Sequence, residues 1–226
     1  MMYNDFKRGD WMRKLRLALA LLSAVFGIGG TVMQLVRSEN IMESLSYFTT
    51  LSNIAAGMVF FAIFIALLKR NHLTWLYTLA HTASVALVVT FIIYHFTLRP
   101  TLETIESLST IGGPLDLSLH YITPLLALMA FLLLPPKKAP LWKASIKPLW
   151  FPFAYLAYII IYVGFGGRFR LDGVYYRQPY FFLDIETYGL FMVMGFIILL
   201  AIFFTLISAL LYVSNHKINA IGRVKT

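Results

Sequence analysis

Residues 46–68 read SYFTTLSNIAAGMVFFAIFIALL, a segment that opens with hydroxyl and amide side chains and then runs apolar for fifteen residues. A helix rises 1.5 Å per residue, so about 20 apolar residues cross the roughly 30 Å hydrocarbon core of a bilayer. Five other segments have a comparable length and composition. We therefore predict six membrane-spanning helices, at 15–36, 48–68, 76–98, 118–134, 149–165 and 188–213.

The composition indicates the same class of protein. The 226 residues are 59% hydrophobic and 13% charged, whereas soluble domains carry about 25% charged residues. The predicted fold is an all-α, polytopic membrane protein with a single domain over residues 1–226. Cysteine is absent, which excludes disulfides, thiolate catalysis, iron–sulfur clusters and cysteine-ligated zinc. We expect no metal and no cofactor.

The formal net charge of +9 is carried by residues that flank the hydrophobic segments. Fourteen of the 19 Lys and Arg residues fall on one side of the predicted topology: Lys7, Arg8, Arg13, Lys14, Arg16, Lys69, Arg70, Lys137, Lys138, Lys143, Lys147, Lys217, Arg223 and Lys225. By the positive-inside rule, both termini are cytoplasmic. Because the basic residues follow the spans and do not gather on one soluble face, the expected partners are membrane lipids and not nucleic acid.

This topology brings polar residues of three spans to one depth near the outer face. They are Thr49, Thr50, Ser52 and Asn53 at the start of the second span, Tyr94 and His95 at the end of the third, and His120 and Thr123 at the start of the fourth. Ionisable residues inside a membrane mark functional sites by default. The sequence therefore predicts an outer-leaflet site between these three helices.

Thr49 and His120 are the candidate catalytic pair. Thr49, Ser52 and Asn53 are spaced i, i+3 and i+4, so they share one helix face. A threonine hydroxyl needs a base to act as a nucleophile, and imidazole, with a pKa near 6.5, is neutral at pH 7 and able to take the proton. Asp116, one turn before His120, has the spacing to orient the ring. The alternative is structural, since a membrane threonine often bonds its own helix carbonyl and a histidine at a helix start can cap the helix.

The six-span layout, the YFTTLSN start of the second span and the LHYITPLLALMAFLLLPP run of the fourth resemble the bacterial Pr6Pr-type membrane proteins. Those are similar in turn to the androgen-induced protein family, multispan hydrolases of fatty acid esters of hydroxy fatty acids. The resemblance implies a threonine nucleophile at Thr49, or at Thr50 if the pattern shifts by one residue, and a catalytic histidine at His120 ahead of Pro124. It also implies a multi-pass protein of a bacterial plasma membrane.

These observations lead to the hypothesis of an intramembrane hydrolase of lipid esters, in which Thr49 attacks the ester carbonyl and His120 serves as base and then as acid. Residues expected to support the substrate or the oxyanion are Thr50, Ser52, Asn53, Tyr94, His95 and Thr123. The aromatic segment 166–187 is expected to lie over this site as a lid. Segment 100–117 is expected to hold a short interfacial helix.

Two other functions fit the same residues. The first is a non-catalytic lipid-binding or transport protein or subunit, in which the polar residues only bind helices or headgroups. The second is a haem protein that uses His95 and His120 as ligands. His81 and His95 lie about 21 Å apart along one helix axis, but His120 completes only three intramembrane histidines, one fewer than two bis-histidine haems need.

Overall fold

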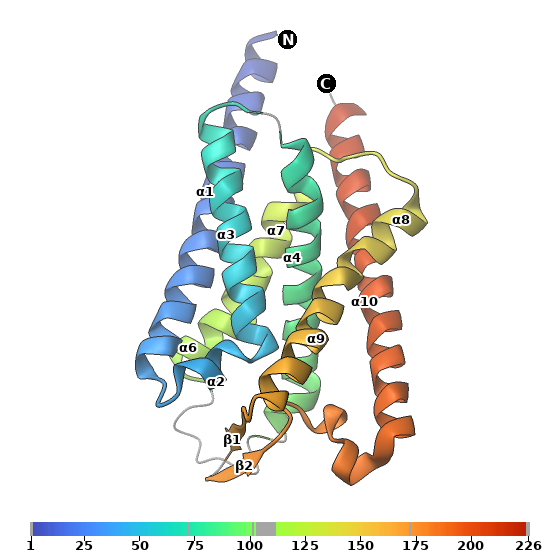
Figure 1. Cartoon of the computed structure of the whole chain (residues 1–226). Coiled ribbons are helices and arrows are strands. Elements are labelled where there is room, and N and C mark those ends of the chain that lie inside the picture. Colours follow the sequence, from blue (N-terminus) through green and yellow to red (C-terminus); the bar gives the residue numbers. More distant parts are fainter. Residues whose placement is uncertain (1, 72, 101, 103–111, 172, 225–226) are drawn as a thin grey trace.

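The computed structural model describes residues 2–71, 73–100, 102, 112–171 and 173–224 (Figure 1). Within these residues, six helices are long and apolar enough to cross a membrane. The strands of this part of the chain form a single two-stranded antiparallel hairpin. The prediction of an all-α, polytopic membrane protein is therefore confirmed.

The elements follow one another along the chain in this order: α1 Met2–Arg37, α2 Ile41–Leu45, α3 Phe48–Leu68, α4 Thr74–Ile93, the π-helix η1 Tyr94–Leu98, α6 Pro114–Leu117, the π-helix η2 Ser118–Ile122, α7 Thr123–Leu132, α8 Leu141–Ile146, the 3₁₀ turn η3 Lys147–Leu149, α9 Trp150–Gly164, β1 Phe169–Leu171, β2 Val174–Tyr176, the 3₁₀ turn η4 Phe181–Leu183 and α10 Ile185–Val224. The third span is α4 with η1, the fourth is α6 with η2 and α7, and the fifth is α8 with η3 and α9.

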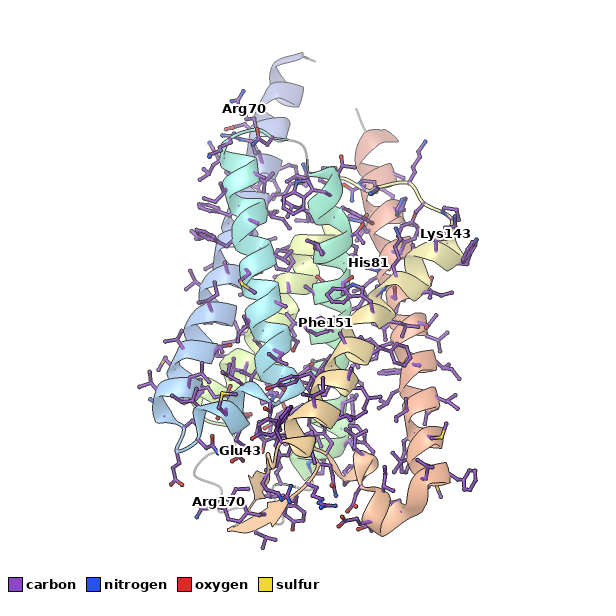
Figure 2. All side chains as sticks on the ribbon, viewed as in Figure 1. Glu43, Arg70, His81, Lys143, Phe151 and Arg170 are labelled. Atoms are coloured by element: carbon purple, nitrogen blue, oxygen red, sulfur yellow. The ribbon has the colours of Figure 1, made fainter. Side chains whose placement is uncertain are left out.

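Both termini lie at one end of the bundle, and α2, α6 and the β1–β2 hairpin lie at the other (Figure 1). We call these the inner and the outer end. Figure 2 shows Arg70 and Lys143 toward the inner end and Glu43 and Arg170 at the outer end, where the Arg170 backbone N–H donates to Glu43 Oε1 at 2.7 Å. An even number of spans places both termini on one side, as the charge pattern predicts.

Helix α4 is the central helix of the bundle. Within its most hydrophobic stretch 67% of the residues are buried, against 11% in α10. Small side chains on α4 permit close approach of its neighbours: Ala80, Ala83 and Ser84 are all buried, and Ser84 Oγ donates to the Ala127 carbonyl of α7 at 3.1 Å. The helix therefore fixes the positions of the elements around it.

Helices α1 and α3 approach each other through glycine. A Cβ added at Gly57 of α3 would lie 2.6 Å from Ile28 Cγ1, and one added at Gly27 of α1 would lie 2.9 Å from the Asn53 carbonyl oxygen. Neither distance is tolerable for a real side chain. These glycines let the polar start of α3 pack directly against α1.

The inner end of α7 is completed by α10. Helix α7 ends at Leu132, and the carbonyls of its last turn have no partner within the helix. Asn215 Nδ2 lies within 3.1 Å of the carbonyl oxygens of Phe131, Leu132 and Leu134. Tyr77 Oη of α4 donates to Asn215 Oδ1 at 2.9 Å and so holds the amide in place.

Two span boundaries differ from the predicted ones for physical reasons. The sixth helix extends well beyond residue 213, because its polar inner turns carry Asn215 to the end of α7 and are not a solvated tail. The fifth span begins at Leu141, eight residues before the predicted start. Pro148 does not end the helical path, since the 3₁₀ turn η3 accommodates it between α8 and α9.

Two of the connections at the outer end of the bundle have a predicted role or structure. Segment 166–187, predicted as a lid, contains the β1–β2 hairpin and η4. Asp184, near its end, caps the first turn of α10. Thr187 donates to the Asp184 carboxylate through its backbone N–H (3.0 Å) and its hydroxyl (2.6 Å), and these bonds hold the pKa of Asp184 below its usual range. The interfacial helix expected in 100–117 falls mainly on residues outside those described.

Candidate functional site

The outer polar residues lie around two π-helical turns that face each other, η1 on the third span and η2 on the fourth. The Tyr94 and His120 rings stack across this contact, with centroids 3.6 Å apart and planes 8° from parallel. Beside them His95 Nδ1 lies 3.1 Å from Tyr121 Oη, to which Arg99 Nη1 donates at 3.0 Å. Insertions of this kind in helices are frequent at functional sites.

Proline explains where the π-turn of the fourth span forms. Pro124 has no N–H and cannot bond the carbonyl four residues earlier, so one helical hydrogen bond is missing there in any register. The Thr123 N–H bonds the Ser118 carbonyl instead, and Thr123 Oγ1 donates to the same oxygen at 2.9 Å. Thr123, predicted as a supporting residue, thus holds the backbone that carries His120.

Asp116 orients His120. His120 Nδ1 lies 2.8 Å from Asp116 Oδ1, and the Gly112 N–H donates to Asp116 Oδ2 at 3.0 Å. The side chains are only 17% and 10% exposed. A carboxylate oxygen accepts, so Nδ1 donates to it. In the neutral ring with this tautomer the lone pair is on Nε2, for which the described residues provide no hydrogen-bond partner. An oriented general base needs such an arrangement.

Asn53 joins the start of α3 to η2. Its Nδ2 donates to the carbonyls of Thr49 (2.9 Å) and Leu119 (3.2 Å), which fixes the orientation of the amide. Ser52 Oγ also donates to the Thr49 carbonyl, at 3.0 Å. Ser52 and Asn53, both predicted as oxyanion donors, therefore donate to backbone carbonyls. Asn53 Oδ1 is buried and accepts no hydrogen bond from the described part of the chain.

Thr50 and Thr49, the two candidate nucleophiles, point to different surroundings. Thr50 is fully buried, and its Oγ1 donates to Gln34 Oε1 of α1 at 3.3 Å. Thr49 instead lines a cavity of about 110 Å³ between α3, α4, α9 and α10. The structure thus distinguishes Thr49 as the candidate residue that borders a cavity.

Four residues of the cavity lining carry hydroxyl groups, and two of these hydroxyls donate to backbone carbonyls. Thr90 Oγ1 donates to the Ala86 carbonyl at 2.9 Å, and Tyr155 Oη donates to the Ser46 carbonyl at 3.0 Å. The other two belong to Thr49 and Tyr180.

Tyr180 reaches the cavity from the outer connection between β2 and η4. Its Oη accepts the Phe48 N–H at 3.0 Å, and Tyr180 shares the cavity lining with Thr49. Removal of the hydroxyl from water raises the pKa of Tyr180 to about 12. It is therefore a neutral phenol, able to donate, at any physiological pH.

The predicted catalytic pair lies in two adjacent groups. Thr49 belongs to the cavity with Tyr155 and Tyr180, whereas His120 lies outside the cavity lining and bonds Asp116. Within the described residues no hydrogen bond joins the Thr49 hydroxyl to the His120 ring, and the two segments are connected through Asn53. Sequence reasoning missed both tyrosines, although the aromatic content of segment 166–187 pointed to an element over the site.

The remaining membrane histidines have other surroundings. His81 Nε2 lies 3.0 Å from the Ser208 carbonyl, and its ring stacks on Phe131 with centroids 5.0 Å apart. The His95 ring stacks on Phe91. Over the described residues no three His, Asp or Glu side chains gather as a metal site would require.

Comparison of the chain with protein-family models, with curated proteins and with solved structures finds no match. The functional argument therefore rests on the geometry of the site.

Proposed function

We propose that this integral membrane protein is a hydrolase of lipid esters, with Thr49 as nucleophile and His120 as general base. The observation that carries the proposal is the position of Thr49 on the lining of an apolar cavity, where the Asn53 amide joins its backbone to Leu119, the residue before His120. The His120 ring in turn bonds the Asp116 carboxylate. The proposed membership in the Pr6Pr-type proteins leads to the same pair.

The reaction follows the usual course of covalent acyl transfer. Thr49 Oγ forms a bond to the ester carbonyl carbon while its proton passes to His120 Nε2. The tetrahedral intermediate collapses, the bond to the alcohol oxygen breaks, and His120 protonates the leaving alcohol. Water then attacks the acyl-threonine, gives a proton to His120, and releases the fatty acid as Thr49 regains its hydrogen.

This reaction requires Thr49 Oγ and His120 Nε2 to come within hydrogen-bond reach, directly or through one water. Catalytic hydrogen bonds are often long before substrate binds and tighten in the complex. Asn53 connects η2 to the first turn of α3, because one amide bonds both backbones.

The test uses purified protein, a fluorophosphonate probe and a long-chain p-nitrophenyl ester. We expect labelling of the wild-type protein, its loss in Thr49→Ala, and a drop in turnover of at least about 1,000-fold. Thr50→Ala is the matched control, because this neighbouring hydroxyl faces Gln34 and not the cavity; turnover should stay within about threefold. Full ester turnover in both Thr49→Ala and His120→Gln would overturn the mechanism.

Asp116→Asn tests the oriented base. Asparagine can present its amide N–H to the ring, which favours the tautomer with the proton on Nε2 and removes the basic lone pair. We expect turnover to fall by about 100-fold or more while the probe-free protein keeps its thermal midpoint within a few degrees. An unchanged turnover would limit the Asp116–His120 pair to a structural role.

A lipid-binding protein without turnover is the second candidate. It is favoured by the finding that Thr49 shares the cavity lining with Tyr180, whereas His120 lies outside that lining. This function predicts that purified protein retains lipid in the cavity but gives neither fluorophosphonate labelling nor hydrolysis of any ester tested.

A further inference from the structure

We propose that the cavity between α3, α4, α9 and α10 binds a single acyl chain that enters from the bilayer, with its uncharged carbonyl group held at the Thr49 and Tyr180 hydroxyls. This inference deepens the proposed function, since it names the ligand class of the same site and the route of access. It does not require turnover.

The lining of the cavity selects an uncharged ligand. Its side chains are aliphatic or aromatic apart from the four hydroxyls, and the described lining includes no Asp, Glu, Lys, Arg or His. A charged headgroup placed there would lose its hydration without gaining a counter-ion, which is strongly unfavourable. A hydrocarbon chain, by contrast, gains from every contact with such walls.

The hydroxyls give the cavity a polar end. Thr49 lies in the first turn of α3 and Tyr180 in the outer connection, so both belong to the outer end of the bundle (Figure 1). The cavity then continues inward along α10 from Ile197 to Phe204, about 10 Å of helix axis. A carbonyl at the outer end and a chain directed toward the bilayer centre match this polarity.

Tyr180 is the donor for the carbonyl oxygen. Its Oη accepts the Phe48 N–H, and as a neutral phenol it also carries one O–H to donate. Tyr180 shares the cavity lining with Thr49, so a ligand carbonyl that meets Thr49 lies within reach of the phenol. Because the phenol is neutral, it binds a ketone or ester oxygen without requiring a negative charge on the ligand.

We place the entrance of the cavity between α9 and α10. Helix α10 packs against α8 and η3, and α9 and α10 lie farther apart toward the outer end (Figure 1). Phe153 of α9 both lines the cavity and is 49% exposed. In a membrane-spanning bundle this exposed side faces lipid tails. An acyl chain therefore passes from the bilayer into the cavity without crossing water.

The experiment uses a ligand that cannot be hydrolysed: a long-chain methyl ketone with a mid-chain diazirine and a terminal alkyne, cross-linked by light to purified protein in nanodiscs. We expect cross-links on residues of α9 and α10 that line the cavity, mapped by mass spectrometry. The carboxylate of the same chain length should cross-link there at least about fivefold less at neutral pH.

Two neighbouring substitutions on α10 give a matched pair. Ala201 lines the cavity, whereas Ile202 faces lipid with 52% exposure. Ala201→Trp should fill the cavity and reduce cross-linking at least about tenfold, while Ile202→Trp should leave it unchanged. Tyr180→Phe should retain the chain but remove most of the preference for the ketone over the carboxylate.

Several outcomes would overturn the inference. Cross-links spread evenly over lipid-facing residues of wild-type protein would show that the chain stays outside, and this result does not depend on how any variant folds. Equal cross-linking of ketone and carboxylate would remove the assignment of the polar end. If Ala201→Trp blocks cross-linking and the wild-type protein hydrolyses no ester, the acyl-chain site is supported and the hydrolase function is rejected. If the protein hydrolyses esters but gives no cross-links in the cavity, the hydrolase function is supported and the acyl-chain site is rejected.

Discussion

The inner and outer halves of the bundle both bury polar side chains, but they use them differently. At the inner end Asn215 is saturated: its amide serves the carbonyls at the end of α7 and its oxygen accepts from Tyr77. At the outer end Asn53 donates twice, yet its buried oxygen accepts nothing in the described part of the chain. Polar groups that complete a helix end stabilise the fold, whereas oriented groups with spare capacity are suited to act on a ligand.

The inner half has an exception of its own. His216 Nε2 is buried without a partner among the described residues, while His216 Nδ1 lies 2.9 Å from the Tyr212 carbonyl. The contrast between the halves is therefore one of degree. Three substitutions test it, each read as a change in the free energy of unfolding.

The largest effect is expected from Asn215→Leu. The change removes the Asn215 amide from the carbonyls of Phe131, Leu132 and Leu134 and takes the acceptor from the Tyr77 hydroxyl. Asn219 Nδ2 still reaches Leu132 and Leu134, at 3.1 and 3.2 Å, and we expect a cost of about 2–4 kcal/mol. For a chain of this length the thermal midpoint in detergent should fall by roughly 6–12 °C. Ser214→Leu, one residue earlier on α10, serves as the control, and equal shifts in both variants would contradict the network as the cause.

A smaller loss is expected from Asn53→Leu. Two bonds to carbonyls disappear, but so does a buried oxygen that has no donor, and the second change offsets part of the first. We expect about 1 kcal/mol, measured in the same thermal assay. Ester turnover should nevertheless fall, because the link between Thr49 and η2 is lost. A stability loss as large as that of Asn215→Leu would erase the distinction between the halves.

The smallest effect is expected from Glu39→Gln. Arg170 Nη1 donates to Glu39 Oε2 at 2.6 Å, but the two side chains are 47% and 85% exposed, and exposed ion pairs contribute little. We expect the unfolding free energies of the variant and the wild-type protein to differ by less than about 0.5 kcal/mol. In 1 M salt, where the screening length is about 3 Å, this difference should disappear. A loss above 1 kcal/mol would mean that the β1–β2 hairpin supports the fold through this pair.

Much of the fold could be predicted from the sequence, because hydrophobic length and basic flanks are set locally along the chain. Six spans and termini at a common end follow from those two signals. The ends of the fifth and sixth spans could not be placed in this way. Pro148 lies in the 3₁₀ turn η3, which continues the helical path between α8 and α9. The polar turns around Asn215 are stabilised by bonds from Asn215 to the carbonyls at the end of α7, a contact that depends on the tertiary fold.

The candidate site was predictable in part for the same reason. Depth in the membrane follows from topology, so the sequence could bring Thr49, His120 and Tyr94 to one level, and the i, i+4 spacing of Asp116 and His120 indicated their contact. The direction in which each side chain points depends on helix rotation and on the register shift in η2. Tyr180 could not be found because its position depends on how the outer connection folds back over α3.

The central position of α4 has a consequence for how the protein is made. Its buried polar side chains, His81 and Tyr77, take their partners Ser208 and Asn215 from α10, the last helix of the bundle to leave the ribosome. Until that helix arrives, the third span holds unsatisfied polar groups in contact with lipid or with the translocation machinery. Chains truncated after α9 should therefore be recognised by membrane quality control and degraded.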